Sequence, residues 1–443
     1  MRRGRKRAVG CVLGRREFLL AVVLLSLSAA LPLHATAADI ADLKTAPRPP
    51  ATQSPARLVA LGPGALRLLA YLDATDGLCA IEAMEQRGPS GRPYTFMLGE
   101  LSETLPVIGP GGVGRLPDLE RLLMVKPDLA VAVTLDEQQL RMLEQRAGIP
   151  VLLLSYGDIG ELQLPVFADS LRRLAEPLGR QARAEALIDA IEASLAELAT
   201  RVADADPVPA YIGGISLKGQ QGLASTQAGH LPLRWAGADN LADRIAESGH
   251  RFIDLEQLLA WNPPVLFIDG GGLPAVLKEV AINPGLFAAL DAVQRRQVFA
   301  TLPFNAYNTN VEHALINAWF MASRLYPEQF PAFDPVAKAD AIYRDFYGEP
   351  LYARLRAEGQ ESQPGFARVD LLTGEVDHYR TLTVDLREMF RDKTISGLTP
   401  WRLARLSLCV WSGARCQSLA RLLRQSFAIE QFGKPHPATG SVS

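Results

Sequence analysis

Cysteine and histidine are scarce in this sequence. Only four cysteines and six histidines occur among its 443 residues. The cysteines are Cys11, Cys79, Cys409 and Cys416, and none belongs to a C-x-x-C pair or stands near a histidine at the spacing of a metal site. The sequence therefore predicts neither a zinc site nor a disulfide framework, although Cys409 and Cys416 could pair in an oxidising compartment.

The sequence also lacks the short signatures of several enzyme classes. It contains no G-x-S-x-G elbow, no H-E-x-x-H helix and no phosphate-binding P-loop. Residues 109–114 match G-x-G-x-x-G, but the next helix is expected only from about residue 117, whereas a dinucleotide fingerprint opens its helix at the glycines. We interpret this stretch as a loop beside a cleft and not as a dinucleotide site, and we expect no catalytic activity.

A strong net charge is absent too, since the formal value is −2, but the charge is unevenly distributed. Residues 1–38 hold seven basic and one acidic side chain, and residues 378–443 hold ten and four. The body, residues 39–377, is left with 29 basic and 43 acidic side chains, a net charge of −14. Because an acidic body repels phosphate backbones, we expect no nucleic-acid partner.

No apolar run reaches the length that a membrane-spanning helix needs. The uncharged run from Phe18 to Ala38 holds about 16 strongly apolar residues, whereas a span needs ~20. It follows a basic start and ends in Ala35-Thr36-Ala37, where a signal peptidase can cut. We therefore interpret residues 1–38 as a cleaved export signal and expect the mature protein in the periplasm.

The export route stays open at this point. Arg15 and Arg16 precede Glu17-Phe18-Leu19-Leu20 in a pattern that resembles a twin-arginine signal. The alternative is a general secretory signal with an incidental arginine pair. Residues 39–56, rich in Ala, Pro and Thr, are typical of a flexible leader.

What the rest of the chain does contain is a regular alternation of aliphatic runs and amphipathic helices. The expected strands cover residues 57–61, 77–83, 105–109, 127–133, 149–155, 209–215, 263–269 and 298–302. The expected helices cover residues 62–74, 116–126, 136–148, 181–202, 231–242, 254–262, 310–326 and 334–348. Such alternation is typical of βαβ units, so the fold class is α/β, with two Rossmann-like lobes and mostly parallel sheets.

One expected helix is much longer than the others. Residues 181–202 contain neither Pro nor Gly, and a single apolar stripe runs along them, formed by Leu187, Ile188, Ile191, Leu195, Leu198 and Val202. A helix of this length spans roughly 33 Å. It lies between the two runs of alternation and is therefore expected to join the lobes as a rigid connection.

The two lobes also share a repeated segment. "PDLERLLMVKPDLAVAV" begins at residue 117 and "IDLEQLLAWNPPVLFID" begins at residue 253, 136 residues later. In both, Asp can cap a helix, the leucines face a sheet, and Pro ends the helix before a buried strand. Any two βαβ units can share leucines and prolines, but this does not require the Glu that both copies have, Glu120 and Glu256.

Together, these blocks resemble the periplasmic substrate-binding proteins of the iron-siderophore, haem and cobalamin class of ABC importers. The resemblance is carried by the two segments above and by "RLVALGPGALRLLAYL", "YIGGISLKGQQGLASTQAGHLPLRWAGADNLAD" and "YNTNVEHALINAWFMASRLYPEQF". It implies an N-terminal lobe at 57–165, connecting helices at 166–205 and a C-terminal lobe at 206–355. Residues 356–443 then form a basic extension of unknown role.

The resemblance also implies a function. The protein would capture an iron chelate, haem or a corrinoid between its lobes and deliver it to an inner-membrane ABC permease dimer, as a monomer without a cofactor of its own. Glu120 and Glu256 match the acidic residues that dock the lobes of the family on the permease, although each could simply be a solvated residue in the first turn of a helix. Two rivals stay open, an exported cofactor-binding enzyme and a chelate-binding sensor that docks no transporter.

Loops that follow the strands supply the candidate ligand contacts, because two-lobe proteins bind at the carboxyl ends of their strands. These candidates are Arg92, Tyr94, Phe96, Ser225, Thr226, His230, Arg234, Asn305, Tyr307 and Asn308. Tyrosine suits Fe(III), histidine suits haem iron or zinc, and arginine pairs with the carboxylates of a chelator. His230 and Asn308 could instead cap helices. No cluster has the spacing of a bare-metal site, so a preformed chelate is expected.

Two aromatic-rich stretches remain. Trp319, Phe320 and Tyr326 fall within the expected helix at 310–326 and are assigned to the core. The stretch from residue 397 to 427 has tryptophans and leucines interspersed with arginines, and it could form a basic amphipathic helix at a membrane surface. The alternative is an extension without such a role or a disordered end.

Overall fold

The structure of the protein is a computed structural model. It describes residues 56–87, 91–158, 161–216, 219–358, 365–379, 381–383 and 407–409. All of these lie in one compact unit, residues 49–443. The expected export signal, its arginine pair, the leader, Cys11, Cys416 and most of the C-terminal extension lie outside the described residues. Of the described cysteines, Cys79 is buried and free.

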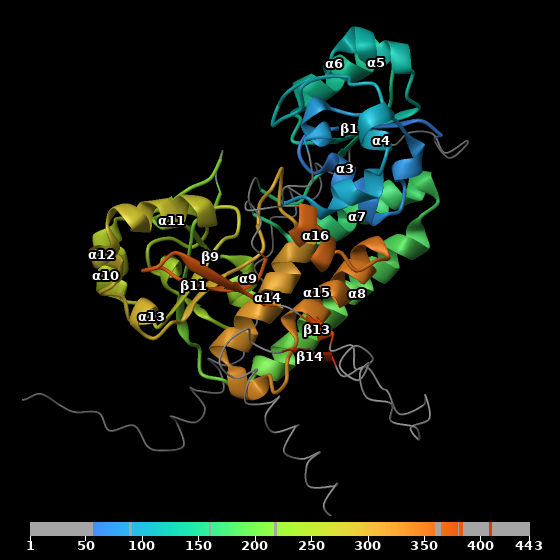
Figure 1. Cartoon of the computed structure of the whole chain (residues 1–443). Helices are drawn as coiled ribbons and strands as arrows, with labels where there is room; N and C mark the ends of the chain where they lie inside the picture. The colour runs from blue at the N-terminus through green and yellow to red at the C-terminus, as the bar shows by residue number, and fades with distance from the viewer. Residues whose placement is uncertain are drawn as a thin grey trace, which may run out of the picture. The chain divides into compact units, whose positions relative to one another are not determined.

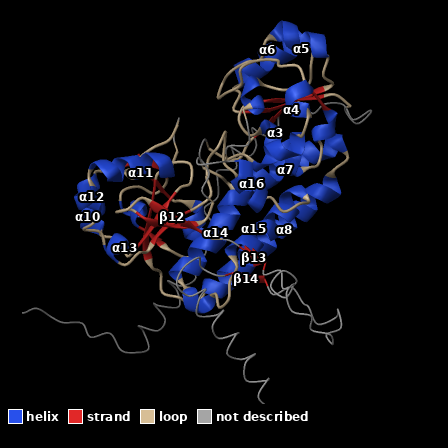
Figure 2. Cartoon of the chain, in the orientation of Figure 1, coloured by secondary structure: helices blue, strands red, loops and turns tan. Residues whose placement is uncertain are grey.

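The first sheet is fully parallel and has the strand order β2-β1-β3-β4. Its strands are β1 (Leu58–Leu61), β2 (Leu78–Ala80), β3 (Leu129–Val133) and β4 (Val151–Leu154). Nearly every residue of these strands is buried, as expected for a sheet that helices cover on both faces. Figure 2 shows helices around each group of strands.

The second large sheet has the order β12-β11-β10-β9-β5-β7. Its strands are β5 (Pro209–Gly213), β7 (Asp239–Asn240), β9 (Val265–Ile268), β10 (Val298–Ala300), β11 (Ala367–Asp370) and β12 (Glu375–His378). The pairs among β10, β9, β5 and β7 are parallel, and β11 and β12 add an antiparallel hairpin. These two sheets confirm the predicted α/β class with mostly parallel strands.

The β11–β12 hairpin differs from the sequence interpretation, which assigned everything after residue 355 to an extension. Phe299 of β10 pairs with Arg368 of β11, so the hairpin continues the second sheet. The reason it was overlooked is physical. Strands of four residues carry little periodicity of their own, and only the exposed edge of β10 provides a partner for their backbone.

Helices pack around the two sheets (Figure 1). Their bounds are α3 (Ala65–Tyr71), α4 (Leu101–Thr104), α5 (Leu119–Val125), α6 (Glu137–Ala147), α7 (Leu164–Leu178), α8 (Gln181–Val202), α9 (Leu231–Trp235), α10 (Leu255–Trp261), α11 (Leu273–Ile282), α12 (Pro284–Phe287), α13 (Asp291–Gln294), α14 (Val311–Leu325), α15 (Pro335–Tyr347) and α16 (Tyr352–Glu358). No described helix is long and apolar enough to cross a membrane.

The long helix is confirmed, because α8 runs from Gln181 to Val202 as the sequence predicted. Within its apolar stripe, Leu187 and Leu198 are fully buried. Helix α8 packs against α7, α14 and α15 (Figure 1). In α14, Trp319 and Phe320 are buried as predicted. The Trp319 indole donates to Ser194 Oγ of α8 at 2.9 Å.

The repeated segment folds in the same way in both copies. Helices α5 and α10 both end at a residue in the left-handed region, Lys126 with φ 45° and Asn262 with φ 43°, and a buried proline and a buried strand follow each. The copies differ at the cap: Asp118 accepts from the N–H groups of Glu120 and Arg121, whereas Asp254 has no side-chain cap bond.

Two other expectations are wrong in detail. The run at 105–109 makes only an isolated bridge, Val107 with Ile81, because Pro106 has no N–H to donate. The helix expected at 231–242 ends at Trp235, because Gly237 turns the chain with φ 75° before β7. The sequence interpretation also missed the antiparallel pair β6 (Ser225–Ala228) and β8 (Gly249–Phe252), which places Ser225 and Thr226 in a strand and not in a loop.

Candidate functional site

One loop contacts both sheets and organises the candidate site. Residues 302–310, called the crossover loop below, lead from β10 of the second sheet to α14. On the side of the second sheet, the Phe304 N–H donates to Asp269 Oδ2 at 2.7 Å, and the Gly271 N–H donates to Asp269 Oδ1 at 2.9 Å. Asp269 directly follows β9, so the carboxyl end of that strand fixes the start of the loop.

Arg67 of α3, which belongs to the first sheet's layer, holds the loop from the other side. Its guanidinium donates to the carbonyls of Ala306 at 2.8 Å and Thr309 at 3.0 Å and to Asn310 Oδ1 at 2.7 Å. The side chain is fully buried, and its charge lies 4.7 Å from the centre of the Tyr94 ring. The planar fork of arginine suits a row of carbonyls, so Arg67 fixes the path of the loop.

At the tip of the loop the backbone adopts a conformation that side chains rarely allow. Tyr307 has φ 56° and Asn308 has φ 83°, and both residues are partly exposed. Asn308 Nδ2 donates to the Pro63 carbonyl at 3.1 Å, and Tyr307 Oη donates to Glu82 Oε2 at 3.0 Å. Two consecutive non-glycine residues in the left-handed region are costly and cluster at functional sites, which marks this tip as a candidate.

Glu82 is the residue that sequence reasoning missed. It follows β2, is 1% exposed, and accepts from the Gly62 N–H at 3.0 Å as well as from Tyr307. Its other oxygen, Oε1, has no hydrogen-bond partner, and neither has the buried Oγ1 of Thr134 at the end of β3. A Cβ on Gly111 would lie 2.8 Å from the Glu82 carboxylate and 2.6 Å from Tyr307 Oη, so only glycine fits there.

Burial controls the charge of the two carboxyl groups that hold the loop. Desolvation raises the pKa of Glu82 from 4.5 to about 7, and it raises the pKa of Asp269 from 3.8 to about 7. Burial, followed by the charge of Glu82, raises the pKa of the Tyr307 phenol, so the phenol stays a donor. Each sheet therefore presents one buried acid at its carboxyl end, and both acids contact the crossover loop.

A second polar layer lies behind Glu82. Arg92 Nη1 lies 3.2 Å from Glu85 Oε2, and Tyr94 Oη donates to the same oxygen at 2.8 Å. All three side chains are less than a tenth exposed. Arg92 also lies 6.0 Å from the centre of the Tyr307 ring. Arg92 Nη1 also donates to the Met84 carbonyl at 2.7 Å, so the polar groups of this layer are held by other protein groups.

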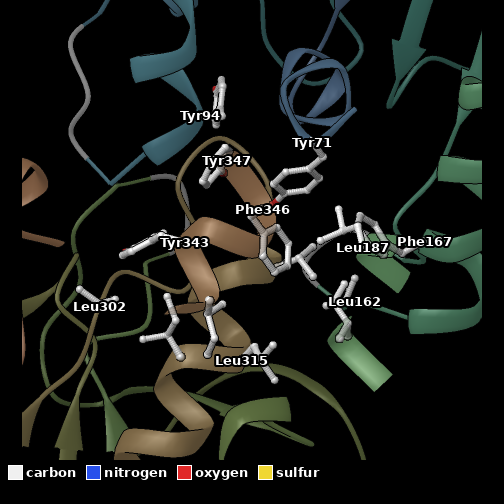
Figure 3. Close-up of a cluster of buried hydrophobic side chains, with 14 of the residues drawn as sticks. Tyr71, Tyr94, Leu162, Phe167, Leu187, Leu302, Leu315, Tyr343, Phe346 and Tyr347 are labelled. Carbon is white, nitrogen blue, oxygen red and sulfur yellow. The ribbon is translucent and has the colours of Figure 1, made fainter. Parts of the chain in front are cut away.

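Polar side chains of α14 continue this network into the core. Glu312 accepts from Tyr347 Oη at 2.9 Å and from Tyr71 Oη, and Figure 3 shows the two rings close together beside Phe346. His313 Nδ1 donates to the Pro303 carbonyl at 2.8 Å, because a carbonyl can only accept. Its Nε2 then accepts from a neighbouring tyrosine hydroxyl, so the imidazole is neutral, and burial lowers its pKa.

His230 is the other buried group near the loop. Its ring is fully buried and lies 4.8 Å from the Phe304 ring in an edge-on arrangement, and neither ring nitrogen has a hydrogen-bond partner. Burial lowers the pKa of His230 to about 3, so the ring is neutral. Its side chain caps no helix, which removes the alternative role that the sequence left open.

The structure separates the predicted ligand contacts into two groups. The side chains with an exposed surface are Asn305, Tyr307, Asn308 and Arg234. Buried side chains are those of Arg92, Tyr94, Phe96, Ser225, Thr226 and His230. Ser225 and Thr226 donate to the Ile215 and Ile212 carbonyls, both at 2.6 Å. Direct contact of these buried side chains with a ligand stays a prediction.

A sequence signal for Glu82 did exist. It follows the apolar run of a predicted strand, which is the position from which the other candidates were chosen. Arg67 ends the stretch 62–67, which also follows a predicted strand, but its role could not be predicted, since it lies within a helix and its partners are about 240 positions away in the chain. Within the described ranges, no three His, Cys, Asp or Glu side chains gather as ligands for a metal ion.

The predicted docking residues lie at matched places. Glu120 on α5 and Glu256 on α10 are both exposed, each in the first turn of its helix. Neither carboxylate forms an ion pair with any residue that the structure describes, and Arg121, next to Glu120, pairs with Asp118 at 3.5 Å. The burial pattern around the two glutamates is the same from Asp118 to Leu122 and from Asp254 to Leu258.

Solved structures share this fold. A molybdate-bound periplasmic binding protein from Haemophilus influenzae is 21% identical with a TM-score of 0.54, and the match covers 68% of this chain and 94% of that one. An ABC transporter solute-binding protein from Sulfurospirillum deleyianum is 24% identical with a TM-score of 0.51, covering 69% and 94%. CeuE from Helicobacter pylori with Ni(II) bound is 18% identical with a TM-score of 0.50, covering 67% and 91%.

No curated protein was found to match the chain. The sequence model of one family does match, over residues 58–303, which is more than half of the chain. Its members are solute receptors of transport systems and not enzymes, in agreement with the expectation of no catalytic activity. The matched range contains the whole first sheet, the parallel strands of the second sheet, α8, the repeated segment and the start of the crossover loop, and on this evidence the chain belongs to the periplasmic binding protein family.

Proposed function

We propose that this protein captures a metal chelate, namely an iron-siderophore, haem or a corrinoid, at the crossover loop and delivers it to an ABC permease. Proteins of this family bind small molecules outside the cytoplasm and pass them to such permeases. The observation that carries the proposal is the loop tip, where the strained Tyr307 and Asn308 stand between the carboxyl ends of both sheets.

The chemistry of this tip suits a chelate better than a bare ion. Asn305, Tyr307 and Asn308 offer partly exposed amide and phenol groups, whereas Glu82 Oε1 and Thr134 Oγ1, which have no partner, are buried. The exposed amide and phenol groups can bond to the periphery of a large ligand, while a bare cation needs several charged donors converging on one point. The Haemophilus influenzae protein has molybdate bound and the Helicobacter pylori protein has Ni(II) bound, which supports a metal-containing ligand without selecting one.

Delivery would use Glu120 and Glu256. Their equivalence in the repeat places one exposed carboxylate on each lobe, and a permease with two similar subunits would offer two matching basic sites. Reversal of both charges should then reduce uptake while ligand binding in solution stays intact. Uptake that is unchanged by the double reversal would favour the alternative, a chelate-binding sensor that docks no transporter.

The identity of the ligand is tested by purification from the source organism, followed by absorption spectroscopy and metal analysis. A haem, corrinoid or ferric-siderophore band at about one ligand per protein is the expected result. The matched control is Tyr307→Ala, which should lose the band. Protein that carries no metal, or a band that Tyr307→Ala retains in full, contradicts the proposed ligand or its place.

A further inference from the structure

The two docking helices are not equivalent beyond their glutamates. On α5, Leu123 and Met124 follow Glu120 at spacings of three and four, so all three share one face of the helix. Met124 is 80% exposed and Leu123 is 46% exposed. The opposite face of α5 packs against the core, where Leu122 is 1% exposed.

The same positions on α10 have a different character. Leu259 and Ala260 follow Glu256 at the same spacings, but Leu259 packs partly into the second core cluster, and Ala260 has only a methyl group to offer. The backbone and the carboxylate are thus repeated, whereas large exposed apolar side chains at these two positions are present on one copy only.

From this difference we propose that the N-terminal lobe docks on its permease subunit through a combined anionic and apolar contact, with Met124 inserted beside Glu120, while the C-terminal lobe docks mainly through charge. The inference rests on the proposed function. Leu123 and Met124 form an exposed apolar pair beside the Glu120 carboxylate, and methionine is enriched at the centre of protein interfaces.

The occupant that fits this surface is a membrane subunit with a basic side chain next to an apolar pocket. A soluble acidic partner is disfavoured, because the body of the chain is itself acidic. Glu120 is available for such a partner, since Arg121 pairs with Asp118. Because the carboxylate and Met124 share a helix face, one subunit surface can meet both at once.

The test compares matched substitutions in a sedimentation assay. Purified protein is mixed with spheroplasts of the source organism, or with liposomes made from the lipids of the same membrane, and the bound fraction is quantified. Met124→Ala should weaken binding to spheroplasts about tenfold, as expected for a buried interface anchor. Met124→Leu should retain binding, and Ala260→Ser, at the equivalent place on α10, should stay within about twofold of wild type.

Three results would overturn the inference or its basis, and they are distinguishable. If Glu120→Gln weakens binding and Met124→Ala leaves it unchanged, docking stands and the apolar contact is wrong. If neither Glu120→Gln nor Glu256→Gln has an effect, the proposed docking itself fails. Equal binding to spheroplasts and to liposomes assigns the surface to lipid and also refutes the inference. Since Met124 is exposed, the folded state of each variant is checked by circular dichroism.

Discussion

Glu82 provides the sharpest test of the electrostatics at the crossover loop. Glu82 is 1% exposed, and its carboxylate accepts hydrogen bonds from the Gly62 N–H and from Tyr307 Oη. The amide oxygen of Glu82→Gln can accept both of these bonds. The substitution therefore removes the titration and preserves the shape of the side chain. The expected consequence is a change in how stability depends on pH.

The magnitude follows from the pKa of Glu82 in the folded and unfolded states. The value rises from 4.5 to about 7 on folding, which corresponds to about 3 kcal/mol, since each pKa unit is worth about 1.4 kcal/mol. A raised pKa means that the folded state holds the proton more tightly. This contribution to stability is fully present below pH 4.5 and is lost as the pH rises through about 7.

Urea unfolding of both proteins, followed by tryptophan fluorescence at several pH values, measures the effect. Between pH 5 and pH 8, the free energy of unfolding of Glu82→Gln should gain about 2 kcal/mol relative to wild type. Asp269→Asn should change the pH dependence in the same direction, because the pKa of Asp269 also rises to about 7. Glu120→Gln, at an exposed position, is the control.

One result would refute the reasoning. If wild type and Glu82→Gln differ by the same free energy of unfolding at pH 5 and at pH 8, burial does not raise the pKa of the Glu82 carboxyl group. The site then does not consist of two buried acids around one loop. The comparison uses only a difference between two proteins, so titration of other groups cancels.

Three further predictions concern single contacts. Asp118→Ala should lower the free energy of unfolding by about 1 kcal/mol, because the Asp118 side chain caps its helix. Asp254→Ala should change it by no more than about 0.5 kcal/mol, because the Asp254 side chain makes no cap bond. Urea unfolding of the two variants measures the difference. Arg67→Met should destabilise the protein by about 3–5 kcal/mol, because two buried acceptors and one partly buried acceptor lose their donor, and Arg67→Lys should be intermediate. A thermal transition for Arg67→Met equal to that of wild type would contradict this. Tyr307→Phe removes one hydrogen bond to Glu82 and should lower the free energy of unfolding by about 1 kcal/mol. It should also weaken binding of the co-purified ligand at least about tenfold, measured by equilibrium dialysis. Unchanged affinity would show that Tyr307 does not belong to the site.

Local sequence patterns determined much of the fold. The uninterrupted apolar stripe at 181–202 was enough to predict α8, because a helix of six turns has no other way to bury one face. The repeated segment predicted α5 with β3 and α10 with β9, since Asp, the leucine pair and Pro act within a few residues of one another. By contrast, the short strands β6, β8, β11 and β12 depend on partners that are distant in the chain, and they were missed.

The candidate site shows the same division. The sequence by itself determined that Tyr307 and Asn308 stand in a loop after a strand, because turn-forming residues separate two apolar runs there. Only the tertiary structure decided that Arg67 and Glu82 hold this loop, that Tyr94 and His230 turn inward, and that burial moves the pKa of Glu82 toward neutrality. The physical reason is that periodicity and capping act over a few residues, whereas desolvation and hydrogen bonds across 240 positions exist only once the two sheets and α14 are packed together.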